Sequence, residues 1–182
     1  ALPHLDPPGE RVKIPFGEHF FYGNLRKPVD SIKPPVILMT LGLDSAKEEM
    51  ETNEIIFLER GMATLAFDGP GQGESEYEQP ICPEYELPVK SALDWLEKRD
   101  DVDSDSVGIW GVSLGGYYAP RAAAFDERIK ACISLTGPFN LIECYEKLPR
   151  LTKTAFMHRS NSSNDEEARQ IATRMSLEGV AE

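Results

Sequence analysis

Short apolar runs separated by helix-length segments are the feature of this sequence that most restricts its fold. The runs cover residues 36–40, 62–67, 107–110 and 131–135. Apolar strands of this kind are typical of parallel sheets that are buried on both faces. Strands that alternate with helices indicate an α/β protein, with a mostly parallel sheet between two helical layers.

Helix signals lie between these runs. Ser45 and Glu48 have the capping-box spacing, and apolar residues follow at positions 50, 55, 56 and 58. Pro83 can open a second helix that runs to about residue 99, although Pro88 favours a later start. A third helix is expected over residues 114–125.

The two ends of the chain have a different character. Residues 1–10 are rich in proline and predict a linker, and residues 12–16 and 19–25 predict a hairpin. Residues 140–182 hold no four-residue apolar run, and 166–177 fit an amphipathic helix. We therefore expect an α/β core over residues 1–139, followed by a helical, lid-like segment.

Ser113 is the strongest candidate for a functional residue. It is the centre of the motif Gly-Val-Ser-Leu-Gly at residues 111–115, directly after one predicted strand and before a predicted helix. A nucleophile elbow needs this context, because the turn is so sharp that side chains two residues away would collide. The sequence thus predicts a serine nucleophile exposed above the sheet. A glycine-rich turn with an incidental serine is the alternative.

An oxyanion hole requires backbone N–H groups beside the nucleophile. One comes from the residue after the nucleophile, which is Leu114, and the other from the loop after an earlier strand. Residues 41–44 form that loop, and the N–H of Leu43 is the candidate. The same loop also leads to the predicted cap at Ser45, and both interpretations can hold together.

The glycine-rich stretch at residues 68–75 matches neither of two phosphate-binding motifs. Its glycines at 69, 71 and 73 do not complete G-x-G-x-x-G, because Glu74 and Glu76 occupy the third positions. No Lys-Ser/Thr pair follows, so it is not a P-loop either. A turn at the rim of the active site fits better. No cofactor and no metal site is expected.

Composition restricts the partners. A net charge of −12 disfavours nucleic acid and anionic membranes, because both need clustered Lys and Arg. No apolar stretch reaches 18 residues. Cys82, Cys132 and Cys144 form no CxxC pair, which fits a reducing cytoplasm, and Cys132 is expected to be buried in the core.

Three motifs together resemble a known family. LGLDSAKEE at residues 41–49, FDGPGQGE at 67–74 and GVSLGG at 111–116 look like the 2,6-dihydroxypseudooxynicotine hydrolase-like branch of the α/β hydrolases, with the related fermentation-respiration-switch esterases. The resemblance covers residues 11–139 well and the last forty residues loosely. It implies a three-layer α/β-hydrolase fold without a dissociable cofactor. It also implies a small-molecule carbonyl or ester substrate, a preceding helical domain and, often, a homodimer.

The resemblance implies cleavage of a C–C bond beside a carbonyl in some members and of an ester in others. An ordinary carboxylesterase or thioesterase and a non-catalytic scaffold are the alternatives. In this fold an acid and then a histidine follow the serine, on loops after later strands. Of the later residues His158 is the only histidine, and it is expected in the lid. We therefore expect a core that is incomplete at its C-terminal end and inactive by itself.

Overall fold

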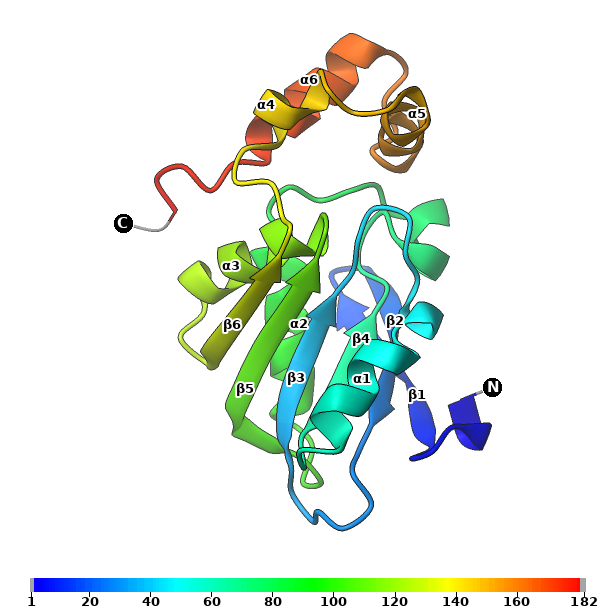
Figure 1. The fold of residues 1–182 in the computed structure, drawn as a ribbon, viewed down its shortest axis with the longest axis vertical. Coiled ribbons are helices and arrows are strands. Elements are labelled where there is room, and N and C mark those ends of the chain that lie inside the picture. Colours follow the sequence, from blue (N-terminus) through cyan, green and yellow to red (C-terminus); the bar gives the residue numbers. More distant parts are fainter. Residues whose placement is uncertain (1, 181–182) are drawn as a thin grey trace.

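The computed structural model describes residues 2–180, which form a six-stranded sheet with helices on both faces (Figure 1). The strands are β1 (Gly9–Phe16), β2 (His19–Arg26), β3 (Pro35–Thr40), β4 (Ala63–Phe67), β5 (Asp103–Val112) and β6 (Ile129–Leu135). Their order across the sheet is β1-β2-β4-β3-β5-β6. Strands β3 to β6 pair in parallel, and β1 and β2 form the expected hairpin, which pairs antiparallel with β4.

Helices cover the two faces of the sheet, as the alternating pattern predicted. Helix α1 (Glu51–Leu58) lies on one face, and α2 (Glu86–Leu96) and α3 (Gly115–Phe125) lie on the other (Figure 1). Successive residues of a strand point to opposite faces of the sheet. Leu38 is fully buried in the core on one face, and Met39 is fully buried in the core on the other. The three-layer α/β architecture is therefore confirmed.

Two helices contain a proline, and the backbone accommodates each one differently. Pro88 lies in the first turn of α2, where an N–H would lack a helical partner anyway, so the helix starts at Glu86. Pro120 lies inside α3 and cannot donate to the Gly116 carbonyl. The hydroxyl of Ser134 on β6 donates to that carbonyl instead, at 2.6 Å.

The capping box predicted at Ser45 and Glu48 is wrong. A 3-10 turn occupies Lys47–Glu49, α1 begins at Glu51, and no side chain caps either one. The physical reason is a tertiary contact, because the Lys47 N–H donates to the Asp68 carboxylate at 2.9 Å. The expected apolar face of α1 is also wrong at Ile56, which is 49% exposed.

The prediction that Cys132 is a buried core residue is wrong as well. Within the described part of the chain, β6 is the last strand in the sheet order and pairs only with β5. Every residue of β6 after Ile129 is exposed, including Ile133 and Leu135. An apolar edge strand and an apolar central strand have the same local sequence pattern, so the sequence could not distinguish them.

Three helices lie beyond the carboxyl ends of the parallel strands (Figure 1). They are α4 (Leu141–Tyr145), α5 (Arg150–Arg159) and α6 (Asp165–Arg174). They pack on one another through buried residues such as Tyr145 and Phe156, whose rings are 5.9 Å apart. Ion pairs join them to the core, from Arg159 to Glu76 at 2.9 Å and from Arg174 to Glu84 at 2.7 Å.

Candidate active site

Ser113 lies in the sharp turn between β5 and α3. Its φ of 56° is in the left-handed region, which is strained for a residue with a side chain. Conformations of this kind cost about 1–3 kcal/mol and persist where the surroundings enforce them. The Ser113 N–H donates to the Leu135 carbonyl at 2.9 Å, which ties the turn to the end of β6.

Glycine is required on both sides of this serine. A Cβ atom built on Gly111 would collide with the carbonyl of Gly115 and with the hydroxyl of Thr40. A Cβ atom on Gly115 would collide with the Thr40 carbonyl. These clashes involve backbone atoms that cannot move aside, so the spacing of the motif has the steric cause that the sequence suggested.

The structure brings the predicted oxyanion residues to the same place as Ser113. A Cβ on Gly42 would lie 3.6 Å from Ser113 Oγ, so the loop after β3 passes directly beside the serine. Leu43 and Leu114 are 9% and 6% exposed and line one cavity with Ser113. Within residues 2–180 neither of their N–H groups donates a hydrogen bond. Buried N–H groups rarely lack a partner. These two N–H groups are therefore candidate hydrogen-bond donors to a ligand in the cavity.

This cavity separates the sheet from the helices above it and has a volume of about 280 Å³. Among residues 2–180, no charged side chain borders it, and the polar side chains that do are those of Ser113, Thr136, Cys144 and Thr152. The described residues that line it are Leu43, Ser113, Leu114, Thr136, Gly137, Pro138, Leu141, Cys144, Leu148, Thr152 and Phe156. An uncharged, largely apolar group is therefore the occupant that the cavity suits best.

Sequence reasoning missed most of the lining residues. Thr136 could have been predicted as a lining residue, because it follows the strand 131–135 and the ends of parallel strands share one edge of the sheet. Cys144, Thr152 and Phe156 lie on helices whose packing has no local signal. The loop at residues 68–75 borders the site through Gln72, whose amide donates to the Leu41 and Gly42 carbonyls.

A buried ion pair supports the same loops. Lys47 and Asp68 both have fully buried side chains, and Lys47 Nζ lies 2.8 Å from Asp68 Oδ2. Burial alone would lower the pKa of Lys47, but hydrogen bonds to Asp68, Glu48 and Glu74 outweigh it and raise the pKa. The ammonium group is therefore charged at every physiological pH and holds the two loops together.

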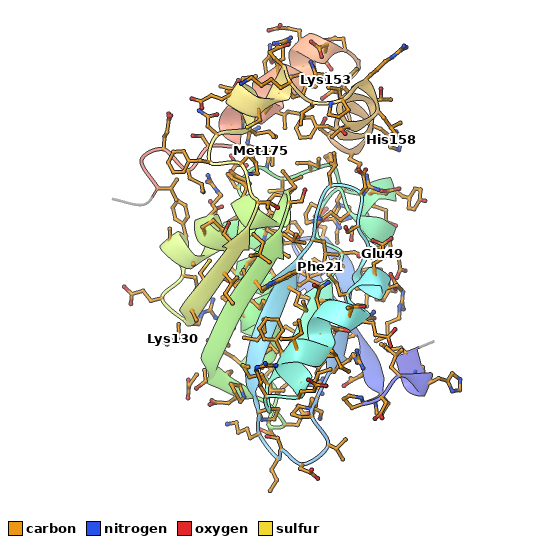
Figure 2. All side chains as sticks on the ribbon, viewed as in Figure 1. Phe21, Glu49, Lys130, Lys153, His158 and Met175 are labelled. Atoms are coloured by element: carbon orange, nitrogen blue, oxygen red, sulfur yellow. The ribbon has the colours of Figure 1, made fainter. Side chains whose placement is uncertain are left out.

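No histidine within residues 2–180 lines the Ser113 cavity. His158 lies on α5 (Figure 2). It borders a different depression, together with Glu76, Tyr77 and Arg159. Two acids of the helical segment, Glu146 and Asp165, are engaged elsewhere, because both pair with Arg169. The part of the chain that the structure covers also has no group of three residues able to hold a metal ion. None of its helices is long and apolar enough to cross a membrane.

The sheet order, the two helical layers and the strained serine turn together define an α/β hydrolase. Residues 24–175 match the X-Pro dipeptidyl-peptidase (S15) family, and the chain belongs to this family. The motif-based resemblance is also confirmed, since 2,6-dihydropseudooxynicotine hydrolase of Paenarthrobacter nicotinovorans is 38% identical over 169 residues. That match covers 93% of this chain and 46% of the relative.

Two further matches agree with this assignment. The crystal structure of the 2,6-dihydroxy-pseudo-oxynicotine hydrolase superposes with a TM-score of 0.93 at 36% identity, over 98% of this chain and 51% of that one. The 20-hydroxy-prefusarin hydrolase of Gibberella moniliformis is 42% identical over 61% of this chain and 28% of its own length. The chain spans half or less of the length of the curated relatives it matches.

Proposed function

We propose that this chain carries the serine nucleophile and the oxyanion hole of a hydrolase that acts on an uncharged carbonyl compound. One observation carries the proposal: Ser113, in a strained elbow, shares a cavity with the two N–H groups of Leu43 and Leu114 that lack partners. N–H groups placed in advance stabilise charge as it develops on a carbonyl oxygen.

The reaction follows from these groups. A base removes the proton of the Ser113 hydroxyl while Oγ attacks the carbonyl carbon, and the electron pair of the C=O bond moves to oxygen. The N–H groups of Leu43 and Leu114 bind this oxyanion, each worth about 3–4 kcal/mol in comparable sites. Collapse of the intermediate expels the leaving group, which takes the proton. Water then releases the acyl group from Ser113 in a second, equivalent cycle.

The cavity supports a neutral substrate. Residues 2–180 contribute no charged side chain to it, and in particular no carboxylate that would bind the free amino group of a peptide. Two relatives are named as hydrolases of 2,6-dihydropseudooxynicotine and of 20-hydroxy-prefusarin. Taken with the motif resemblance, this favours cleavage of a C–C bond next to a carbonyl, with ester hydrolysis as the second candidate.

A base and its carboxylate partner complete this mechanism. His4, His19 and His158 all lie outside the Ser113 cavity, so we propose that both groups belong to parts of the protein other than residues 2–180. The C–C and ester reactions use the same elbow and differ in the leaving group. A C–C hydrolase expels a carbanion that takes the proton on carbon, whereas an ester hydrolase expels an alkoxide or phenolate that takes the proton on oxygen.

The test is reaction of the full-length protein with a fluorophosphonate probe. We expect one label per chain on Ser113, loss of the label in Ser113→Ala, and normal labelling in Ser163→Ala, which changes an exposed serine of the helical segment. Label retained after Ser113→Ala would disprove the nucleophile, and absence of any label would favour a scaffold. Hydrolysis of a 1,3-diketone but not of p-nitrophenyl butyrate would distinguish C–C from ester cleavage.

A further inference from the structure

The side chain of Gln72 is fully buried, and its amide group donates two hydrogen bonds to the loop beside Ser113. Its Nε2 donates to the carbonyls of Leu41 and Gly42, each at 2.9 Å. Its Oε1 accepts from the Tyr85 hydroxyl at 2.8 Å. A flipped amide would press Oε1 against two carbonyl oxygens, so these contacts allow only one orientation.

The Gly42 carbonyl and the Leu43 N–H belong to the same peptide group, so a contact with the carbonyl also affects the N–H of the oxyanion hole. The peptide is trans, as only Asp6–Pro7 is cis in the described chain. In a planar trans peptide the C=O and N–H groups point in opposite directions. The hydrogen bond from Gln72 to the Gly42 carbonyl therefore fixes the direction of the Leu43 N–H.

The far end of the same loop is fixed as well. Lys47 donates its backbone N–H to Asp68 Oδ1 at 2.9 Å, and its Nζ lies 2.8 Å from Asp68 Oδ2. Asp68 and Gln72 belong to one glycine-rich loop. That loop thus holds the segment from Leu41 to Lys47 at both ends, and Gln72 is the contact nearest to Ser113.

We infer that Gln72 is a positioning residue of the oxyanion hole: oriented by Tyr85, it holds the Leu41 and Gly42 carbonyls and so directs the Leu43 N–H at the substrate. The inference rests on the proposed function and extends it to a residue that does not touch the substrate. Close packing accounts for the glycines of this loop, because a Cβ on Gly69 would collide with Tyr85 and a Cβ on Gly73 with Asp68.

Few other contacts could replace Gln72. The Gly42 carbonyl has one further donor, the Ser45 N–H, at a long 3.4 Å. Without the amide, two buried carbonyls would lose their partner and the loop would shift to find one. Oxyanion donors need accurate placement, so a small shift of the Leu43 N–H costs rate without closing the cavity.

The experiment measures fluorophosphonate inactivation of the full-length protein, with the maximal rate and the half-saturating concentration determined separately. We expect Gln72→Met to lower the maximal rate about 10- to 100-fold, less than complete loss of an oxyanion donor. The half-saturating concentration and the final one label per chain should stay unchanged. Tyr85→Phe should give a smaller loss in the same parameter.

The matched control is Gln79→Met. Gln79 is also buried next to the same loop, and its Nε2 also donates to a backbone carbonyl, but to Phe20 on β2 at 3.2 Å. Its maximal rate should stay within about twofold of wild type. A Gln72→Glu variant adds a chemical readout, because its new carboxyl group can donate to a carbonyl only when protonated. Its rate relative to wild type should rise as the pH falls from 8 to 5.

The possible results separate the two proposals. If wild type is not labelled at Ser113, the proposed function fails and this inference fails with it. If wild type is labelled but the folded Gln72→Met variant reacts as fast, only the role of Gln72 is refuted. An equal loss in Gln79→Met would also refute it. Should Gln72→Met not fold, Tyr85→Phe and the pH dependence of Gln72→Glu decide the question, and unchanged rates in both refute it.

Discussion

The hydroxyl of Thr40 lies 3.0 Å from the carbonyl oxygen of Gly115, the first residue of the helix that follows Ser113. The same hydroxyl is 3.2 Å from the carbonyl of Trp110 on β5. Thr40 also pairs with Gly111 in the register between β3 and β5. One buried side chain therefore joins the end of β3 to both sides of the serine turn.

Replacement of Thr40 by valine should weaken this junction. The shape is kept, but the Gly115 and Trp110 carbonyls lose a donor, which costs about 1–2 kcal/mol of folding free energy. Urea unfolding measures that loss, and fluorophosphonate labelling of Ser113 should become slower. Thr40→Ser keeps the hydroxyl and should retain most of the labelling rate. Equal rates for Thr40→Val and wild type would contradict the role of the hydroxyl.

The glycine before Ser113 should tolerate no side chain. In Gly111→Ala the new methyl group would collide with the Gly115 backbone, and overpacking of this kind costs about 1–3 kcal/mol or more. The turn would have to open, so we expect labelling of Ser113 to fall by at least about 100-fold, similar to the loss of an oxyanion donor.

Gly108→Ala is the matched control on the same strand. Its Cβ would lie 2.9 Å from Ile37 Cδ1, the flexible end of a side chain that can move aside. We expect normal labelling in this variant once its folding is confirmed by thermal unfolding. A Gly111→Ala protein that reacts like Gly108→Ala would show that the turn does not depend on close backbone contact.

The features that could be predicted from the sequence are those set by residues close to one another in the chain. The strands and the elbow could be predicted, because burial on both faces and the clash around Ser113 act within a few residues. The start of α1 could not, since the contact of Lys47 with Asp68 joins residues 21 positions apart. Cys132 was misjudged for a similar reason, because position in the sheet order, not local sequence, decides which strand is exposed.

The residues that line the Ser113 cavity could likewise be predicted only where they lie near a motif or a strand end in the sequence. Leu43 and Leu114 were predicted because they adjoin the motif in sequence or follow a neighbouring strand. Cys144 and Phe156 depend on how three helices fold back over the sheet, which no periodicity specifies. Gln72 was visible as part of a glycine-rich loop, but its contact with the Gly42 carbonyl required the tertiary structure.

The thiol of Cys144 offers a direct probe of the cavity. It is exposed and borders the same cavity as Ser113, whereas burial raises the pKa of Cys82 to about 11 and keeps that thiol protonated. N-ethylmaleimide at pH 7 should therefore modify Cys144 and spare Cys82. The added group would fill part of a cavity of about 280 Å³, so subsequent labelling of Ser113 should slow markedly.

Two variants separate this effect from general damage. In Cys144→Ser, maleimide should no longer slow the labelling of Ser113. Cys132→Ser should remain sensitive, because Cys132 is exposed but does not line the Ser113 cavity, whereas Cys144 does. Mass spectrometry identifies the modified residue in each case. If Cys144→Ser is as sensitive as wild type, the thiol does not control access to Ser113.

Acid should weaken the link between the glycine-rich loop and its neighbours through Glu74. Its carboxylate lies 2.6 Å from Lys47 Nζ and 2.7 Å from Arg11 Nη2. Burial would raise the pKa of Glu74, but the hydrogen bonds from Lys47 and Arg11 outweigh it and hold the pKa below the ordinary 4.5. Folding therefore favours the ionised form. The resulting stability is present above pH 4.5 and is lost as the pH falls through the lower, folded-state pKa.

The free energy of urea unfolding, measured between pH 7 and pH 3, should accordingly fall less steeply in Glu74→Gln than in wild type. Glu78→Gln is the control, because Glu78 is exposed and forms no ion pair among residues 2–180. It should keep the wild-type slope. High salt should reduce the difference between the variants, since the Glu74 side chain is 46% exposed and its ion pairs are partly screened. Identical slopes in all three proteins would show that Glu74 contributes nothing to the acid sensitivity.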